Sequence, residues 1–339
     1  MQKKVIGLTL SSLLFALCSV GVLLVALCSS TDAQQPRKVY RVGYLDPSSA
    51  SATAGLLEAF RQELSKHGWT EGKNLITEYR FAELKSDRMP ELAAELVRWK
   101  ADVIVAAGGG PSAARKVTAT IPIVVATGVD LVSAGLAESL ARPGGNVTGL
   151  SILGPELITK RLEILREVVP KLTKVGILMR AGAGAGTGQQ QQMEEIRAVA
   201  SALKLSLQEL PTELDTVGLE RTFKKAAQQV NAIIPTAGRL TFAARKPIAE
   251  LAIKYRLPAI YQEQEFVDEG GLMSYGPDFP DLYRRAAYFV DRILRGAKPA
   301  DLPIEQPRSF DFVVNLNSAK QIGLAIPPNV LARANRVIR

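Results

Sequence analysis

Apolar and polar positions follow two different periods along most of the chain. Residues 103–106 and 123–126 are uniformly apolar, as strands buried on both faces are. Between such runs, apolar side chains recur every three or four positions, and residues 54–66 show this spacing up to a helix end at His67-Gly68. Strand, helix and strand in this order predict a parallel sheet with right-handed crossovers.

The same pattern extends through the rest of the chain. It predicts further strands at residues 39–44, 75–79, 147–150, 174–179, 206–209, 232–234, 259–261 and 272–275, and further helices at 88–99, 156–168, 193–203, 219–229 and 247–254. Turn residues at 142–146 interrupt the array, which then restarts. Two consecutive strand–helix–strand arrays predict a bilobed α/β protein. A Gly- and Gln-rich stretch at 182–192 is interpreted as a surface loop, with a ligand-wrapping loop as the alternative.

The first 33 residues have the organisation of an export signal. Lys3 and Lys4 precede an uncharged apolar run at 5–28, and a polar stretch leads to a small residue, Ala33. This pattern predicts a signal peptide over residues 1–33 that is cleaved after Ala33, and hence a periplasmic protein. An uncleaved membrane anchor is the alternative, because the apolar run is near the ~20 residues of a membrane span.

Composition excludes several classes of function. The chain has 339 residues, of which 47% are hydrophobic and 22% charged, and this excludes a disordered or fibrous protein. Its cysteines, Cys18 and Cys28, both lie in the predicted signal, and its one histidine is His67, so we expect no metal site. The net charge of +9 is scattered along helices, which argues against nucleic-acid binding. Gly108-Gly109-Gly110 does not complete a dinucleotide fingerprint, so no cofactor is expected.

Candidate binding residues follow the predicted strands. In parallel α/β sheets, ligands bind beyond the carboxyl ends of the strands. In the first half, the residues at these positions are Tyr44, Asp46, Gly109, Ser112, Thr127 and Asp130. Backbone N–H groups of the glycine-rich turn suit an anion, and Asp130 suits an ammonium group. Tight-turn glycines and an Asp130 that caps the next helix are the structural alternatives.

The second half offers a polar and aromatic set at corresponding positions. Its candidates are Thr236, Tyr261, Glu265 and Tyr275. With Phe266 nearby, the aromatic rings and the carboxylate could form an amphipathic pocket for an aromatic or cationic group. Structural packing is the alternative for each ring taken singly.

Several longer strings resemble the substrate-binding proteins of ABC transporters, in the family that includes tryptophan and tyrosine binders. They are EGKNL at 71–75, PELAAELV at 90–97, ARPGGNVTGLS at 141–151, GGLMSYG at 270–276, DLYRRAA at 281–287 and LPIEQP at 302–307. The resemblance implies a type I periplasmic-binding-protein fold, in which two Rossmann-like lobes with parallel sheets are joined by a three-stranded hinge. It implies an N-terminal lobe of residues 38–149 plus 275–304 and a C-terminal lobe of 150–274 plus 305–339.

The resemblance also implies a function. The protein is expected to be a monomer that captures a small ligand, such as an aromatic amino acid, between its lobes and delivers it to a membrane permease. First-lobe loops are expected to hold the ligand's carboxylate, and acidic or hydroxyl groups its amine. The loop at 179–184 lacks the family's Asn-Pro pair, which leaves the ligand open. An exported sensory module and a carboxylate-based α/β enzyme are the alternative functions, although no nucleophile motif is present.

Overall fold

The computed structural model describes residues 38–128, 130–152, 154–181 and 186–339. The predicted signal peptide lies outside the described residues. Tyr40–Arg339 form one compact unit. Within the described ranges, no helix combines the length and the apolar character that crossing a bilayer requires.

The first half of the chain builds a parallel sheet with the order β2-β1-β3-β4-β5. Its strands are β1 (Tyr40–Asp46), β2 (Leu75–Phe81), β3 (Val103–Ala107), β4 (Ile123–Thr127) and β5 (Val147–Gly149). All their pairings are parallel. Every residue of β3 and β4 is buried, which confirms the interpretation of these uniformly apolar runs as central strands.

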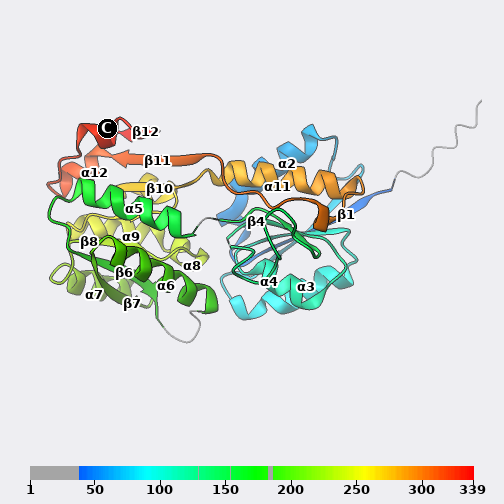
Figure 1. Ribbon diagram of the computed structural model, residues 1–339, viewed down its shortest axis with the longest axis horizontal. Coiled ribbons are helices and arrows are strands. Elements are labelled where there is room, and N and C mark those ends of the chain that lie inside the picture. The colour runs from blue at the N-terminus through cyan, green and yellow to red at the C-terminus, as the bar shows by residue number, and fades with distance from the viewer. Residues whose placement is uncertain (1–37, 129, 153, 182–185) are drawn as a thin grey trace, which may run out of the picture. The chain divides into compact units, whose positions relative to one another are not determined.

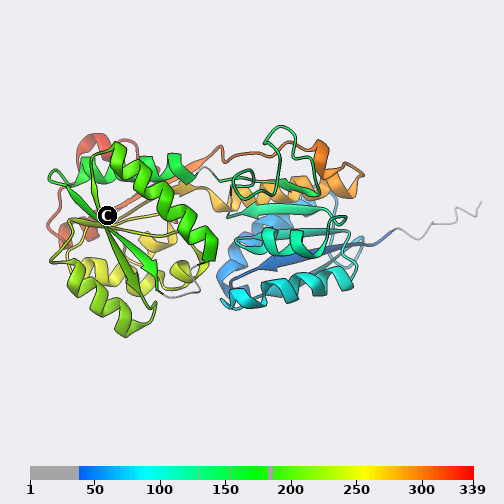
Figure 2. The same ribbon diagram turned by 60° about the horizontal axis from the view of Figure 1, so that its bottom comes forward.

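Helices cover both faces of this first sheet. One core cluster joins the sheet to α2 (Ala50–Lys66) and α11 (Phe279–Leu294), and the other joins it to α3 (Met89–Arg98) and α4 (Gly110–Val117). A short 3-10 turn, η1 (Ser86–Arg88), precedes α3. Figure 2 shows the sheet between α11, drawn in orange, and the cyan helices. Distant parts of the sequence therefore share one core.

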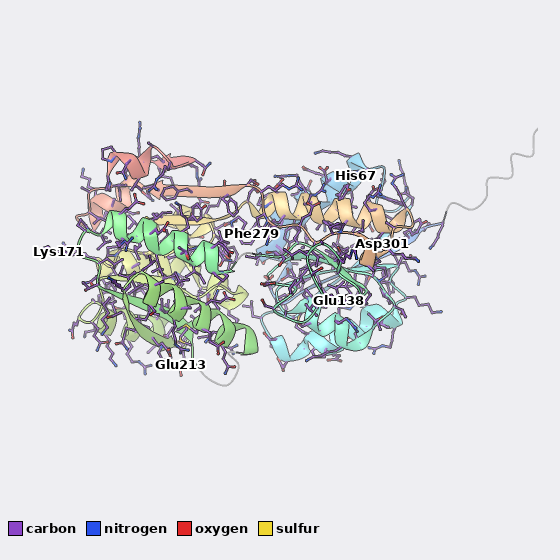
Figure 3. The ribbon with its side chains drawn as sticks, in the orientation of Figure 1. His67, Glu138, Lys171, Glu213, Phe279 and Asp301 are labelled. Atoms are coloured by element: carbon purple, nitrogen blue, oxygen red, sulfur yellow. The ribbon has the colours of Figure 1, made fainter. Side chains whose placement is uncertain are left out.

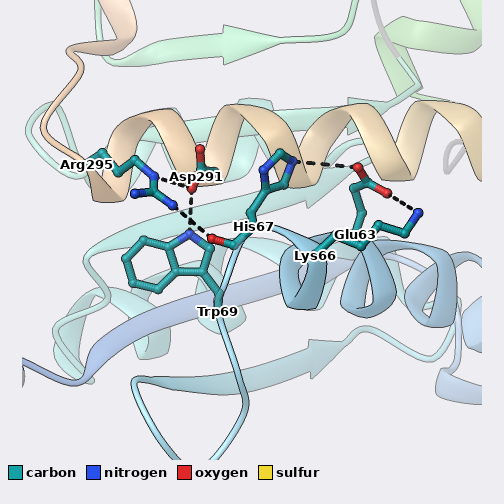
Figure 4. A network of polar contacts seen from close by, with 6 residues as sticks. All are labelled: Glu63, Lys66, His67, Trp69, Asp291 and Arg295. Atoms are coloured by element: carbon teal, nitrogen blue, oxygen red, sulfur yellow. Dashed lines mark hydrogen bonds and ion pairs between the residues drawn. The ribbon is translucent and has the colours of Figure 1, made fainter.

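Polar contacts fasten α11 to the end of α2 (Figure 4). The Trp69 indole donates to Asp291 Oδ1 at 2.8 Å, and Arg295 donates to the same oxygen at 2.6 Å. A second Arg295 nitrogen donates to the carbonyl of His67, the residue that caps the end of α2. The His67 ring lies 3.7 Å from a Glu63 carboxylate oxygen. The one histidine of the sequence thus has a structural position at a helix end.

The second half contains a three-stranded sheet, β7-β6-β8, and a four-stranded sheet, β12-β11-β10-β9. An isolated bridge between Ile233 and Ala259 connects them. The strands are β6 (Lys174–Arg180), β7 (Ser206–Thr212), β8 (Ala232–Pro235), β9 (Ile260–Tyr261), β10 (Met273–Pro277), β11 (Phe310–Asn315) and β12 (Arg336–Ile338). The β10–β11 pair is antiparallel and the other pairs are parallel.

Two core clusters lie on the faces of these strands. The helices are α5 (Gly154–Val168), α6 (Gly186–Ala202), α7 (Thr216–Ala226), α8 (Arg239–Ala243), α9 (Arg245–Lys254), α10 (Glu265–Asp268), α12 (Leu316–Gln321) and α13 (Pro328–Leu331). Residues of α5, α6 and α12 contribute to one cluster, and residues of α7, α9 and α10 to the other. Both halves are therefore helix–sheet–helix layers, as the sequence pattern predicts.

The chain passes between the two halves three times. The first passage leads from β5 into α5, and the second leads from β10 into α11, whose first residue, Phe279, is labelled in Figure 3. The third follows a 3-10 turn, η3 (Pro299–Asp301), and leads into β11, which Figure 1 shows in orange. Leu150 and Glu305, from two of these passages, form a parallel bridge. The residue numbers assigned to the lobe boundaries stay a prediction.

Two helices begin a full turn or more before the residue that the pattern predicts. Helix α2 starts at Ala50 and not at residue 54, because the Ser49 hydroxyl caps it by accepting from the Ala52 amide at 3.3 Å. Helix α6 starts at Gly186, so the interpretation of 182–192 as a loop was wrong from residue 186 onward. Residues 182–185 lie outside the described residues. Polar composition alone underestimates a helix whose stability comes from tertiary packing.

Candidate functional site

At the carboxyl edge of the first sheet, the loops after β3 and β4 approach each other closely. Gly128 has φ +112°, and a Cβ on it would lie 2.7 Å from the backbone of Gly108, which has φ +55°. Glycine is required here because a side chain would separate the two loops. Gly109 caps the start of α4, is exposed, and has open space where a side chain would stand. The open space lies in front of a helix amino terminus.

Tyr44 and Asp46 are buried and bonded to their neighbours. The Tyr44 hydroxyl donates to Asp46 Oδ2 at 2.8 Å, and lies 3.0 Å from the Tyr283 hydroxyl of α11. The other Asp46 oxygen accepts from the amide and the hydroxyl of Ser48, at 2.8 and 2.5 Å. Tyr44 also packs against Phe81. This geometry favours a structural role for both residues, which pin β1 to α11 and shape the loop that follows.

The remaining first-half candidates divide into two kinds. Asp130 Oδ1 accepts from the amides of Val132 and Ser133, and Oδ2 accepts from the Ser133 hydroxyl at 2.8 Å, so the capping alternative describes it well. Thr127 ends β4, and its buried hydroxyl has no hydrogen-bond partner among the described residues. Ser112 lies half-buried in the first turn of α4. Among the first-half candidates, the residues with groups available to bind a ligand are therefore Gly109, Ser112 and Thr127.

The second half contains a small pocket beyond the carboxyl ends of β8 and β9. Its volume is about 200 Å³ when the space open to solvent is counted. Its walls combine apolar and aromatic side chains with hydroxyl, amide and carboxylate groups, namely Pro235, Thr236, Ala237, Gly238, Thr241, Phe242, Tyr261, Gln262, Glu263 and Phe266. A concave site with aromatic walls and a few polar groups is typical of small-molecule binding.

An aromatic stack forms one side of this pocket. The rings of Tyr261 and Phe266 are stacked at 4.6 Å, and Phe242 meets Phe266 edge-on at 6.3 Å. The Tyr261 hydroxyl is buried and has no hydrogen-bond partner in the part of the chain that the structure describes. Burial raises the pKa of this hydroxyl, which therefore stays protonated and can donate. An unsatisfied buried hydroxyl is costly unless something binds it.

The other second-half candidates lie around this pocket. Thr236 lines it, and its amide is fixed by the Leu178 carbonyl at 2.8 Å. Glu265 begins α10, directly before Phe266. Tyr275, on β10, stacks on Phe310 at 6.0 Å. The structure thus brings Thr236 and Tyr261 into one pocket, whereas Tyr275 packs on the opposite face of the sheet.

Several pocket residues were not predicted from the sequence. Thr241 and Phe242 belong to α8, a helix too short for periodicity to reveal. Gln262 and Glu263 follow β9, in a loop that the strand-end rule selects, although neither was a candidate site residue. No group of three or more metal-ligating side chains occurs among the described residues.

Two α/β halves with mostly parallel strands, three passages of the chain between them, and a pocket at strand ends define a solute-binding protein of the type I periplasmic-binding-protein fold. A family model described as ABC transporter substrate binding protein matches residues 45–338. The chain belongs to this family of ABC transporter substrate-binding proteins, and it is a protein that binds a small solute. The predicted fold and class are confirmed.

Individual relatives agree with this assignment. The chain is 23% identical to the tyrosine-binding protein of Clostridioides difficile over 338 residues, which cover 95% of this chain and 93% of the relative. A crystal structure of a conserved domain protein from Vibrio cholerae matches with a TM-score of 0.81 at 27% identity, covering 88% of this chain and 100% of that one. A Streptococcus pneumoniae ABC domain in complex with L-Trp matches with a TM-score of 0.80 at 23% identity, covering 89% and 100%.

Proposed function

We propose that this protein captures an aromatic amino acid, with the side chain of the ligand in the second-half pocket, and delivers it unchanged to an ABC permease. The observation that carries the proposal is the pocket, where aromatic walls lie beside the Tyr261 hydroxyl, which has no hydrogen-bond partner among the described residues. An aromatic side chain would pack against Phe242 and Phe266, and a polar atom on it or an ordered water would accept from Tyr261. The tyrosine-binding and L-Trp-bound relatives support this ligand class.

The size of the pocket supports capture from two sides. The pocket is shallow and open to solvent, and the space it encloses on all sides is about that of one water molecule. It therefore holds one part of the ligand. The loops after β3 and β4, with Gly109, Ser112 and Thr127, would cover the rest when the halves close.

The three passages between the halves would act as the hinge for this closure. At the first and third passages, the Ser151 amide donates to the Glu305 carbonyl at 2.9 Å, and the Glu305 amide donates to Gly149 at 2.9 Å. A few residues held at element ends are the usual site of hinge rotation. Ligand favours closure because only the closed form contacts it from both sides.

The cellular setting is part of the same proposal. Members of this family are extracellular or periplasmic, and they deliver small ligands to ABC permeases. For this chain we propose export by the signal peptide over residues 1–33, with cleavage after Ala33. We propose a monomer that needs no cofactor and no nucleic-acid partner.

The test is calorimetric titration of the purified protein. The protein is unfolded and refolded first, to remove any ligand carried through purification, and then titrated with the twenty amino acids and a panel of sugars and polyamines. We expect an aromatic amino acid to bind with micromolar or tighter affinity, which corresponds to about 8 kcal/mol. A folded protein that prefers a sugar or a polyamine, or that binds none of these, contradicts the proposal.

A further inference from the structure

Arg161 is a buried cation in the middle of α5. Its side chain is 5% exposed, and Ile158, Leu162 and Leu165 around it belong to the second-half core. Among the arginines whose side chains the structure describes, it is the only buried one. Proteins bury a guanidinium where a paired charge and hydrogen bonds replace the lost water.

The protein supplies only part of that replacement. Arg161 Nε donates to the backbone carbonyl of Tyr275 at 2.7 Å. No carboxylate of the described residues forms an ion pair with its guanidinium, whereas Arg285 makes two bonds to Glu305, at 2.7 and 2.6 Å, and Arg295 is paired with Asp291. The terminal nitrogens of Arg161 thus make no hydrogen bond to a described residue.

The charge of Arg161 persists at neutral pH. Burial lowers the pKa of this guanidinium to about 10, and the carboxylate of Glu263 acts against that shift. The group is a cation at pH 7, and its terminal donors, which bond to no described residue, suit a planar oxyanion.

Strand register places Arg161 near the pocket. The β9–β10 pairing sets Ser274 beside Tyr261, so Tyr275, which holds Arg161, stands beside Gln262. Gln262 and Glu263 both line the pocket. Gly276 lies so close to Gln262 that a Cβ would overlap its carbonyl oxygen, which fixes these two loops together. Arg161 lies on the α5 face of the second-half sheet and the Tyr261–Phe266 stack on the other face, and both are beside the loop that follows β9.

We infer that Arg161 is the anion anchor of the ligand site, and that its terminal nitrogens bind the carboxylate of the solute. The inference rests on the proposed function, since it names the group that holds one end of the same ligand. A guanidinium and a carboxylate can form two parallel, charge-assisted hydrogen bonds. The carboxylate then points toward the second half, opposite to the expectation that first-lobe loops hold it.

The experiment compares ligands with and without the carboxylate. Wild-type protein is titrated with L-tyrosine and L-tryptophan and with tyramine and tryptamine, the amines that lack only that group. We expect each amine to bind at least about 30-fold more weakly than its amino acid. Arg161→Gln should weaken amino-acid binding about 100-fold and change amine binding less than about threefold, and Arg161→Lys should fall between.

A matched control is available on the same helix. Arg166 is exposed on α5, so Arg166→Gln makes the same change of charge without touching the site, and it should bind both ligand types as wild type does. Circular dichroism and thermal unfolding establish that each variant is folded. If Arg161→Gln does not fold, the conservative Arg161→Lys variant decides: its affinity should fall for the amino acid and not for the amine.

Several outcomes overturn the inference and are distinguishable. If wild-type protein binds an amino acid and its amine equally well, or if folded Arg161→Gln keeps full affinity, the anchor is refuted while the proposed function stands. Inorganic phosphate is also tested as a competitor of the bound amino acid. If it displaces that ligand as strongly as a second amino acid does, a carboxylate anchor is refuted. Wild-type protein that binds no amino acid refutes both proposals.

Discussion

Both halves of this protein carry polar residues at the carboxyl edge of their sheet, but these residues differ in their hydrogen-bond partners. At the first edge, the polar atoms of Tyr44 and Asp46 form hydrogen bonds to each other and to Ser48 and Tyr283. Asp130 accepts hydrogen bonds within its own turn. At the second edge, the hydroxyls of Tyr261 and Ser274 are buried without a hydrogen-bond partner among the described residues.

This difference shows that a polar residue after a parallel strand has two possible fates. It becomes part of the turn when an acceptor or donor lies within a few residues, as at Asp46 and Asp130. It stays available to a ligand when the backbone places it away from such partners, as at Tyr261. Thr127 is the first-edge residue that resembles the second edge, because its buried hydroxyl also lacks a partner in the described chain.

The largest expected effect comes from filling the close approach between β10 and the loop after β9. A Cβ on Gly276 would overlap the Gln262 carbonyl, so Gly276→Ala should lower the free energy of unfolding by about 3 kcal/mol. At the other edge, Gly109 has open space and φ −77°, so Gly109→Ala should change stability by less than about 0.5 kcal/mol. Urea unfolding of both variants measures this contrast, and equal effects would contradict it.

The next prediction compares Tyr44, whose hydroxyl is hydrogen-bonded, with Tyr261, whose hydroxyl has no partner among the described residues. Tyr44→Phe removes a hydroxyl that donates to Asp46 Oδ2 and lies 3.0 Å from the Tyr283 hydroxyl. Both of these buried oxygens then lose the hydrogen bond to Tyr44. We expect a loss of about 2 kcal/mol in unfolding free energy and unchanged ligand affinity. Thermal and urea denaturation, together with calorimetric titration, give both values. A loss of ligand affinity in a folded protein would return Tyr44 to the binding site.

Tyr261→Phe should show the reverse pattern. Removing a buried hydroxyl that has no partner among the described residues should leave the unfolding free energy within about 1 kcal/mol of wild type. Ligand affinity should fall about tenfold, equivalent to about 1.4 kcal/mol, if the hydroxyl donates to the ligand. Affinity equal to wild type would place the ligand elsewhere.

The smallest effect concerns pH and two carboxylates near the passages between the halves. Hydrogen bonds from Arg285 lower the pKa of Glu305, so its ionised form stabilises the fold above pH ~4.3, and this is lost as the pH falls through the lowered pKa. Because the side chains of the pair are only partly buried, with Arg285 35% and Glu305 18% exposed, Glu305→Gln should cost only about 0.5 kcal/mol at pH 7, and the difference should vanish in acid.

Asp311 provides a control, because its pKa is shifted in the opposite direction to that of Glu305. Burial and nearby Asp278 raise the pKa of Asp311, so its ionised form is unfavourable to the fold above that pKa. Asp311→Asn should therefore be neutral or slightly stabilising at pH 7, and its difference from wild type should shrink as the pH falls. Stability curves of both variants between pH 3 and 7 check the two signs.

The sequence predicted the layers of this fold well, because the strands buried on both faces carry an unbroken apolar run. Residues 103–106 and 123–126 were placed within a residue of β3 and β4. The predicted helix starts were less accurate. Helix α2 begins about a turn before the predicted residue because Ser49 caps it. The Gly- and Gln-rich start of α6 offers no periodic signal at all.

The site was harder to predict, because its members depend on long-range pairing. A strand-end rule selected Thr236 and Tyr261, which line the pocket, but it also selected Tyr44, whose hydroxyl lies 3.0 Å from that of Tyr283, 239 positions away. The burial of Arg161, the anion anchor that we propose, could not be predicted for the same reason. A charged residue on an amphipathic helix is usually solvated, and this one is buried only because β10 returns to α5 from 114 positions further along the chain.

The most direct test of two-sided capture is amide hydrogen exchange with and without the aromatic amino acid that binds best. The account predicts slower exchange on binding at both edges, in residues 235–242 and 261–266 of the second half and in residues 107–112 and 127–131 of the first. Protection confined to one half, or an exchange pattern unchanged by a ligand that binds, would contradict it.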